Sequence, residues 1–286
     1  MRTPLARRLL RVSPISSAVF GLVMLLLCAP AAVADPSTPS KVSARYKIYF
    51  NGIEIGSFQF ESNSDSAKYS LAGRAKLSAL LGILKWSGAL RSEGTLARGE
   101  PLPSDYFFRY KSSSDSGSVT MSFDKRRVAE TKLEPPPSPS KSRVPLTEEH
   151  LKDVFDPMSA VLAMTTGGLD NPCERKVAVF DGKQRFDIVL TFRRKESIKE
   201  AQPSGEPAVA FVCGVRYIPI AGHKKNNRMV RSLAASEDIE VALRPVLSAN
   251  ILVPYEISIP TIAGPAVLKS QRVEILTGMK QIALVH

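Results

Sequence analysis

The residues with the clearest capacity for chemistry in this chain are its three histidines. His150 lies in the polar stretch TEEHLKDVF, and His223 lies beside two lysines in AGHKKNNRMVR. Either imidazole could serve as the base of a Ser/His/Asp hydrolase, whose members often come from distant loops. The chain has no G-x-S-x-G, Walker, G-x-G-x-x-G or H-E-x-x-H motif. We therefore assign no catalytic residue, leave enzyme activity open, and expect His286 to be frayed at the chain end.

A basic run follows His223 and forms a candidate anion-binding site. Lys224, Lys225 and Arg228 are its central members, with further support from Arg231. A charge run of this kind is either a solvated edge or a site for phosphate or carboxylate groups, and arginine adds bidentate geometry. Three consecutive cations at 193–195 would enlarge this patch if they lay close in space.

An apolar segment around the single tryptophan forms a second candidate site. The segment LSALLGILKW interrupts the alternation of the strands around it. It is a plug that caps the core, a lip over an apolar cavity, or a loop that touches a membrane, because a lone tryptophan suits an interface. The candidate lip consists of Leu80, Leu81, Ile83, Leu84 and Trp86.

Cysteine usage predicts one disulfide. Beyond the first 34 residues only Cys173 and Cys213 are present, and they do not form a C-x-x-C pair. An even count in an oxidising compartment favours a structural disulfide. With so few histidines and cysteines we expect no metal site and no cofactor.

The elements that would position these residues are mostly strands. Alternating apolar residues in YSLAGRAKL and SVTMSFD, and an Asp-Gly turn within VAVFDGKQRFDIVLTF, predict antiparallel strands and a hairpin. Further strands are expected around 208–218, 238–243, 253–259 and 267–276. The fold class is therefore mainly β, a curved antiparallel sheet or half-barrel with one or two short helices.

The hairpin KIYFNGIEIGSFQF carries a slip in its apolar pattern. A two-residue Asn51-Gly52 turn places Ile53 on the apolar face but turns Phe58 and Phe60 away from it. A bulge at Gly56, where a left-handed conformation is allowed, would return both phenylalanines to that face. Bulges bend a strand, so the slip predicts curvature.

Two segments set the domain boundaries. The proline-rich connector 134–146 cannot pair inside a sheet, so residues 45–286 form either a single β-rich domain or two lobes joined there. After it, Asp156 and Pro157 have the N-cap and first-turn pattern of a short helix.

The N-terminus reads as an export signal. Four arginines, a short apolar run and the sequence Ala32-Val33-Ala34 match a signal peptide over residues 1–34, followed by a flexible tether over 35–44. Cleavage there would lower the formal charge from +12 to +8 and leave no transmembrane anchor. We expect a periplasmic location, which makes nucleic acid an improbable partner and an envelope lipid or anionic glycan a suitable one.

Several landmarks occur together in a familiar order: YKIYFNGIEIGSF, GTLARGEPLPSDYFF, DPMSAVLAM, VFDGKQRFDIVL, CGVRYIPIAG and PYEISIPTIAGPAVLKSQRVE. With these the chain resembles the bacterial envelope family known as domain of unknown function 3108, from about residue 46 to residue 273. The resemblance implies export and a β-rich fold and nominates no catalytic residue. A further likeness to the half-barrels of lipoprotein carriers is one of fold alone.

These observations favour an exported, non-catalytic binding or envelope-maintenance protein. An amphiphilic ligand would lie on a concave sheet face, with its apolar part near the candidate lip and its anionic head near the basic run. The alternatives are a hydrolase acting on cell-wall or lipid material, and a scaffold that binds another protein through exposed strand edges. The sequence leaves the oligomeric state open.

Overall fold

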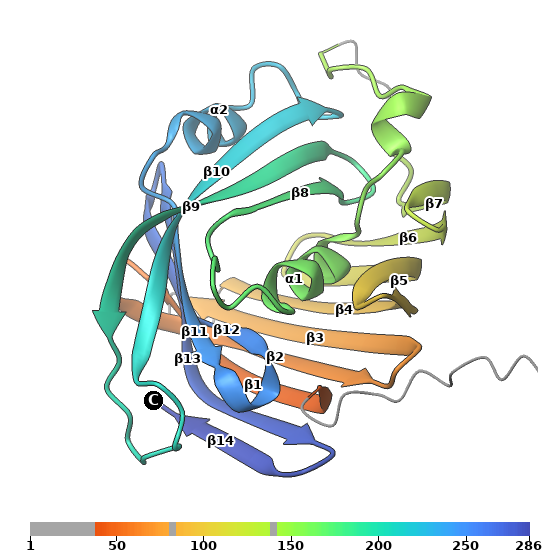
Figure 1. The fold of residues 1–286 in the computed structure, drawn as a ribbon. Coiled ribbons are helices and arrows are strands. Elements are labelled where there is room, and N and C mark those ends of the chain that lie inside the picture. Colours follow the sequence, from red (N-terminus) through yellow and green to blue (C-terminus); the bar gives the residue numbers. More distant parts are fainter. Residues whose placement is uncertain (1–37, 80–83, 138–141) are drawn as a thin grey trace, which may run out of the picture. The chain divides into compact units, whose positions relative to one another are not determined.

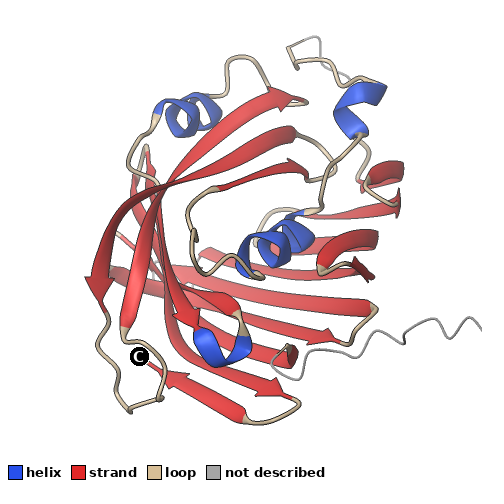
Figure 2. Cartoon of the chain, viewed as in Figure 1, coloured by secondary structure: helices blue, strands red, loops and turns tan. Residues whose placement is uncertain are grey.

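A computed structural model describes residues 38–79, 84–137 and 142–286 of the chain. These residues form one antiparallel sheet of fourteen strands and two α-helices (Figures 1 and 2). No helix among them is long and apolar enough to cross a bilayer. The strands are β1 (Pro39–Phe50), β2 (Ile53–Ser64), β3 (Lys68–Ala79), β4 (Leu84–Ala97), β5 (Glu100–Ser112), β6 (Ser116–Asp124), β7 (Arg127–Glu134), β8 (Arg175–Phe180), β9 (Arg185–Ser197), β10 (Val209–Ala221), β11 (Glu240–Val246), β12 (Ile251–Thr261), β13 (Gly264–Thr277) and β14 (Gln281–Val285); the helices are α1 (Pro157–Thr165) and α2 (Arg228–Ala235).

The sheet confirms the predicted fold class. Its strands follow the order β7-β6-β5-β4-β3-β2-β1-β13-β12-β11-β10-β9-β8, with β14 added beside β13. The sheet curves without closing into a barrel, and α1 lies inside the curve (Figure 1). It joins the strands on both sides of the connector 134–146, so they share a single sheet.

The central seam of the sheet joins β1 to β13. Pro39 is paired with Thr277 and Phe50 with Ala266, so segments from opposite ends of the chain are neighbours. Pro39 is buried at the first position of β1, where a strand tolerates a proline. The predicted tether 35–44 is therefore wrong from residue 39 onward, because its Pro/Ser-rich composition hid the start of a strand.

The predicted bulge in the first hairpin is confirmed. Ile48 is paired with Gly56 but Tyr49 with Glu54, so Ile55 is the extra residue of the bulge. The register beyond it places Phe58 opposite Tyr46, on the inner face. Gly56 is required for a different reason from the one predicted. Its φ is not positive, and a β-carbon there would collide with the Lys76 carbonyl oxygen of β3.

The segment before α1 spans the gap between the two free ends of the sheet. The Val154 amide donates to the Arg126 carbonyl, in the β6–β7 turn, at 2.9 Å. Phe155 forms a parallel bridge with Val179 of β8. The predicted helix then begins at Pro157, capped by Asp156. The short segment 154–156 therefore ties both ends of the sheet to the helix inside it.

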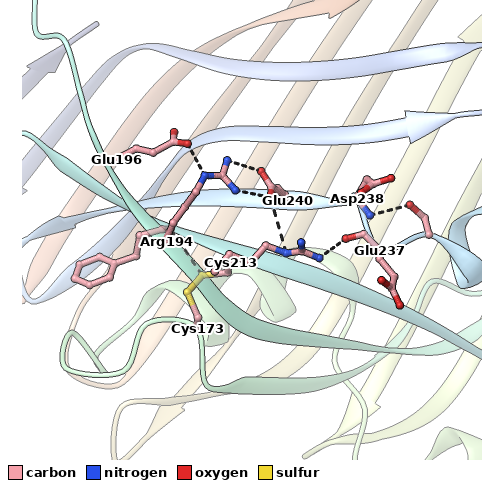
Figure 3. Close-up of polar contacts among 10 residues, drawn as sticks. Cys173, Arg194, Glu196, Cys213, Glu237, Asp238 and Glu240 are labelled. Carbon is pink, nitrogen blue, oxygen red and sulfur yellow. Dashed lines mark hydrogen bonds and ion pairs between the residues drawn. A yellow bond between two sulfur atoms is a disulfide. The ribbon is translucent and has the colours of Figure 1, made fainter.

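The predicted disulfide is present and links the loop after α1 to the sheet. Cys173 and Cys213 are 5.4 Å apart at their Cα atoms, and Cys213 lies on β10 (Figure 3). Beside it, Arg194 of β9 donates two hydrogen bonds, of 2.7 and 2.8 Å, to Glu240 of β11 (Figure 3). Arg193 donates to the Glu237 carbonyl, so these two cations are engaged within the sheet.

Candidate functional site

The concave side of the sheet holds an apolar cavity of about 530 Å³. It lies among the inner faces of β1, β2, β12 and β13, the β4–β5 turn and one side of α1. Most of its wall is aliphatic or aromatic, which is the usual lining of a site for an apolar ligand. The lining residues are Thr38, Pro39, Val42, Ala44, Tyr46, Phe58, Phe60, Ser62, Ser64, Leu96, Arg98, Gly99, Glu100, Val161, Leu162, Thr165, Thr166, Gly167, Asn250, Ile251, Leu252, Val253, Pro254, Ile257, Leu268 and Val273.

The first hairpin supplies the aromatic part of this wall. The bulge at Ile55 turns Phe58 and Phe60 inward, and both line the cavity. Phe58 lies against Tyr46, with ring centroids 6.1 Å apart. The slip in the sequence pattern therefore places two aromatic rings in the site.

A buried polar network fixes α1 over the cavity. The Asp156 carboxylate accepts the Met158 and Ser159 amides at 2.9 and 3.0 Å. It also accepts the hydroxyl groups of Ser159 at 2.5 Å and of Ser92, from β4, at 3.0 Å. The Tyr69 hydroxyl is 2.7 Å from the Ser159 Oγ. Because α1 is linked in this way to β3 and β4, the helix has one position relative to the sheet.

Burial controls the ionisation of this network. Asp156 is fully buried, and desolvation raises the pKa of its carboxyl despite the hydrogen bonds that lower it. Burial also raises the pKa of Tyr69, so its hydroxyl stays protonated and able to donate. All members of the network are engaged with one another, which is the pattern of a structural anchor.

Polar side chains are a minority of the cavity wall. The Tyr46 side chain is buried, burial raises its pKa, and its hydroxyl has no hydrogen-bond partner among the residues that the structure describes. Arg98, in the β4–β5 turn, and Glu100, the first residue of β5, bring one charge of each sign to the cavity wall. Tyr46 can therefore donate to a ligand oxygen inside the cavity, and Arg98 can meet an anionic group.

Of the candidate lip, the structure describes the side chain of Trp86. Leu80, Leu81 and Ile83 lie outside the described residues, and Leu84 begins β4. Trp86 belongs to β4 and lines a separate hollow of about 650 Å³ together with Leu77, Lys85 and Lys111. Trp86 does not line the apolar cavity.

The candidate anion site is a third location. Lys224 and Lys225 precede α2, and Arg228 is its first residue. All three side chains are exposed, and none lines the cavity. No described side chain of either predicted set lines the cavity, and the binding roles of both sets stay predictions.

The geometry gives no histidine the partners of a hydrolase. His150 closes its own turn, because its Nδ1 accepts the Thr147 amide at 3.2 Å. The buried Nδ1 of His223 has no partner among the described residues. No three His, Cys, Asp or Glu side chains within those residues are grouped to hold a metal ion.

His286 is ordered, so the prediction of a frayed residue is wrong. Its Nε2 is 2.9 Å from the Nη1 of the fully buried Arg244, and its Nδ1 is 3.1 Å from the Ser270 Oγ. Burial is the largest cause that lowers the pKa of His286 from 6.5 to about 4, and the Arg244 charge is the next. Arg244 also donates to Glu200 at 2.6 Å, so the cluster holds the β9–β10 loop.

Comparison with known proteins gives a match to a family model. A family model described as a protein of unknown function, DUF3108, matches residues 45–266. The chain belongs to the DUF3108 family. No curated protein and no solved structure matches the chain. The DUF3108 match covers the first hairpin, α1 and most of the cavity wall, and its printed description assigns no activity.

Proposed function

We propose that this DUF3108 protein is an exported, periplasmic, non-catalytic binding protein that holds the apolar part of an amphiphile in the concave cavity. The cavity of about 530 Å³ is the observation that carries the proposal. Its size lies within the range of ligand sites, and its walls are largely apolar. A lipid is favoured over a sugar because the largely apolar wall cannot replace the many hydrogen bonds that a sugar makes to water.

The orientation of the ligand follows from the polar groups at the site. The acyl part would lie against Phe58, Phe60 and Leu268, and a ligand oxygen would accept from the Tyr46 hydroxyl. An anionic head would lie near Arg98, in the β4–β5 turn. This head position replaces the basic run at 224–228 as the proposed partner of the head, because the run does not reach the cavity wall.

Export is supported by two features of the chain. Residues 1–34 carry the signal-peptide pattern. The Cys173–Cys213 disulfide suits an oxidising compartment. The hydrolase alternative has no comparable support among the described residues, where His150 closes its own turn and the Nδ1 of His223 has no partner.

Native mass spectrometry tests the proposal. The full chain is expressed, purified gently from the periplasmic fraction, and measured before and after delipidation and addition of phosphatidylglycerol. We expect a lipid adduct that returns on addition. A chain that stays in the cytoplasm contradicts the export proposal, and an apo mass without lipid uptake contradicts the binding proposal.

A cavity-filling variant locates the ligand. Val161 lines the cavity from α1, so Val161→Trp should reduce phosphatidylglycerol uptake at least tenfold, as expected when a bulky ring occupies the acyl site. Met229→Trp adds the same ring on α2, at a side chain outside the cavity, and should leave uptake unchanged. Equal uptake by both variants would show that the lipid binds elsewhere.

A further inference from the structure

A tripeptide repeat on alternate strands forms a second feature of the sheet. The pattern Arg-x-Lys occurs as Arg45-Tyr46-Lys47 on β1, Arg74-Ala75-Lys76 on β3 and Arg109-Tyr110-Lys111 on β5. Successive side chains of a strand point to opposite faces. The middle residue therefore faces the core, as the buried Tyr46 does, and both cations face outward.

The strand register aligns the repeats into two rows. Arg45, Arg74 and Arg109 share one row, connected through Gln59 and Ala89 on the intervening strands. Lys47, Lys76 and Lys111 share the next row, connected through Ser57 and Ser87. Because adjacent strands are about 4.8 Å apart, the cations are spaced about 10 Å across the sheet and about 7 Å along it. We call these six residues the basic grid.

The basic grid is mostly free of counter-charges. Within the part of the chain that the structure describes, Lys47 is the grid member with an ion pair, to Glu54 at 2.7 Å. The other five side chains are exposed. The intervening Ser57, Gln59, Ser87 and Ala89 are small or neutral, so they leave the cations accessible. Self-repulsion among such cations opposes folding and favours an anionic partner.

Acidic residues of the same face lie toward the other end of the strands. Glu93 and Asp105 are paired across β4 and β5, and Glu61 lies on β2 beyond Gln59. The charge on this face therefore changes sign along the strands, with the positive end at the lysine row.

Exposed apolar side chains lie at the turns beyond the lysine row of the basic grid. Ile53, directly after the β1–β2 turn, is 68% exposed, and Ile262, in the β12–β13 turn, is 57% exposed. Asn51 joins the two turns, donating from its amide to the Pro265 carbonyl at 3.0 Å. The two turns beyond the lysine row thus carry two isoleucines with most of their surface exposed, and Ile53, which pairs with Phe50, lies at the strand end on the face opposite the lysines.

We propose that the basic grid docks the protein on a bilayer surface that carries anionic phospholipid headgroups, with Ile53 and Ile262 entering the interface. A two-dimensional array of cations matches the two-dimensional layer of phosphates at a bilayer surface. A linear polyanion would need only a single row of cations. Charge together with exposed apolar groups gives the two signals that stable peripheral attachment requires. This docking does not depend on a ligand in the cavity.

Vesicle flotation tests the docking. The protein is mixed with vesicles of phosphatidylglycerol and phosphatidylcholine, or of phosphatidylcholine alone. Each basic residue near an anionic surface contributes about fivefold to partitioning, so Arg45→Gln/Arg74→Gln/Arg109→Gln should lower binding to the anionic vesicles about 100-fold. All three changes are at exposed positions, and Gln59 already occupies the same row, so unchanged melting temperatures are expected.

A matched control separates the grid from net charge. Lys224→Gln/Lys225→Gln/Arg228→Gln removes the same charge at three exposed positions outside the grid and should lower binding less than about threefold. Equal losses in both variants, no binding to anionic vesicles, or binding of soluble dextran sulfate in place of vesicles would each overturn the proposal.

Two further variants complete the test. Ile53→Ser/Ile262→Ser should weaken vesicle binding in high salt, where the charges are screened, more than in low salt. An equal or smaller effect in high salt would remove the isoleucines from the interface. Val161→Trp, which fills the cavity, should bind vesicles as the unchanged protein does, so docking and ligand binding can fail separately.

Discussion

The two faces of strands β1 to β5 are built from the same short sequences but have opposite properties. On β3, Leu71 and Gly73 face the core while Arg74 and Lys76 are exposed. On β1, Tyr46 lines the cavity and its neighbours Arg45 and Lys47 belong to the basic grid. The difference shows that period-two alternation can give one set of strands an apolar cavity wall on one face and a row of exposed cations on the other.

The largest contrast is expected from truncations on opposite faces of β3. Leu71 is fully buried in a core cluster, so Leu71→Ala should lower the free energy of unfolding by about 3 kcal/mol. Arg74→Ala, three residues away on the exposed face, should change it by less than about 0.5 kcal/mol. Urea unfolding measures both. Similar losses would show that the outer face is also structural.

The bulge tests whether the inner face depends on local geometry. Gly56→Ala introduces a β-carbon against the Lys76 carbonyl oxygen and should lower the free energy of unfolding by about 2 kcal/mol. It should also weaken phosphatidylglycerol uptake, because Phe58 and Phe60 follow the bulge into the cavity. Ser57→Ala, on the outward side of the same strand, is the control. Unchanged stability and uptake in Gly56→Ala would separate the bulge from the cavity.

The smallest effect is expected from ionisation on the inner face. Burial raises the pKa of Asp156, so the folded state binds its proton more tightly than the unfolded state. Its contribution to stability is then present below the ordinary aspartate pKa and is lost as the pH rises through that value toward the raised one. Asparagine keeps the N-cap without titrating.

Denaturant unfolding over a pH series checks the sign. The stability of the unchanged protein relative to Asp156→Asn should fall as the pH rises above the ordinary aspartate value of 3.8. His286 acts in the opposite direction, since its lowered pKa favours folding as the pH rises from about 4 to 6.5, and its contribution is the same in both proteins. A constant or rising difference would contradict a raised pKa at Asp156.

Local patterns in the sequence account for much of the fold. The Asn51-Gly52 turn, the alternation of β3 and the Asp156 cap each depend on neighbouring residues, and the structure contains all three. The disulfide was also predictable from its even cysteine count. The start of β1 was missed because its partner strand is far away in the chain, and local composition carries no trace of that pairing.

Only part of the cavity wall could be predicted from the sequence. The bulge indicated that Phe58 and Phe60 turn inward, but Val253 and Leu268 come from strands that meet β1 and β2 only through the seam. The candidate lip at 80–86 is indicated by an apolar segment with a single tryptophan and a break in strand alternation, and none of these features reveals which wall a strand contributes to. The Arg-x-Lys repeat was visible in the sequence, but its alignment into rows required the register.

The β1–β13 seam also sets the order in which the protein can mature. β1 is synthesised more than two hundred residues before its partner, so its edge stays unpaired for roughly 10–45 seconds at ordinary rates of translation. The cavity draws one wall from each side of that seam. An incomplete chain therefore lacks one wall of the cavity, so the proposed ligand would be bound only after the last strands have been made and paired.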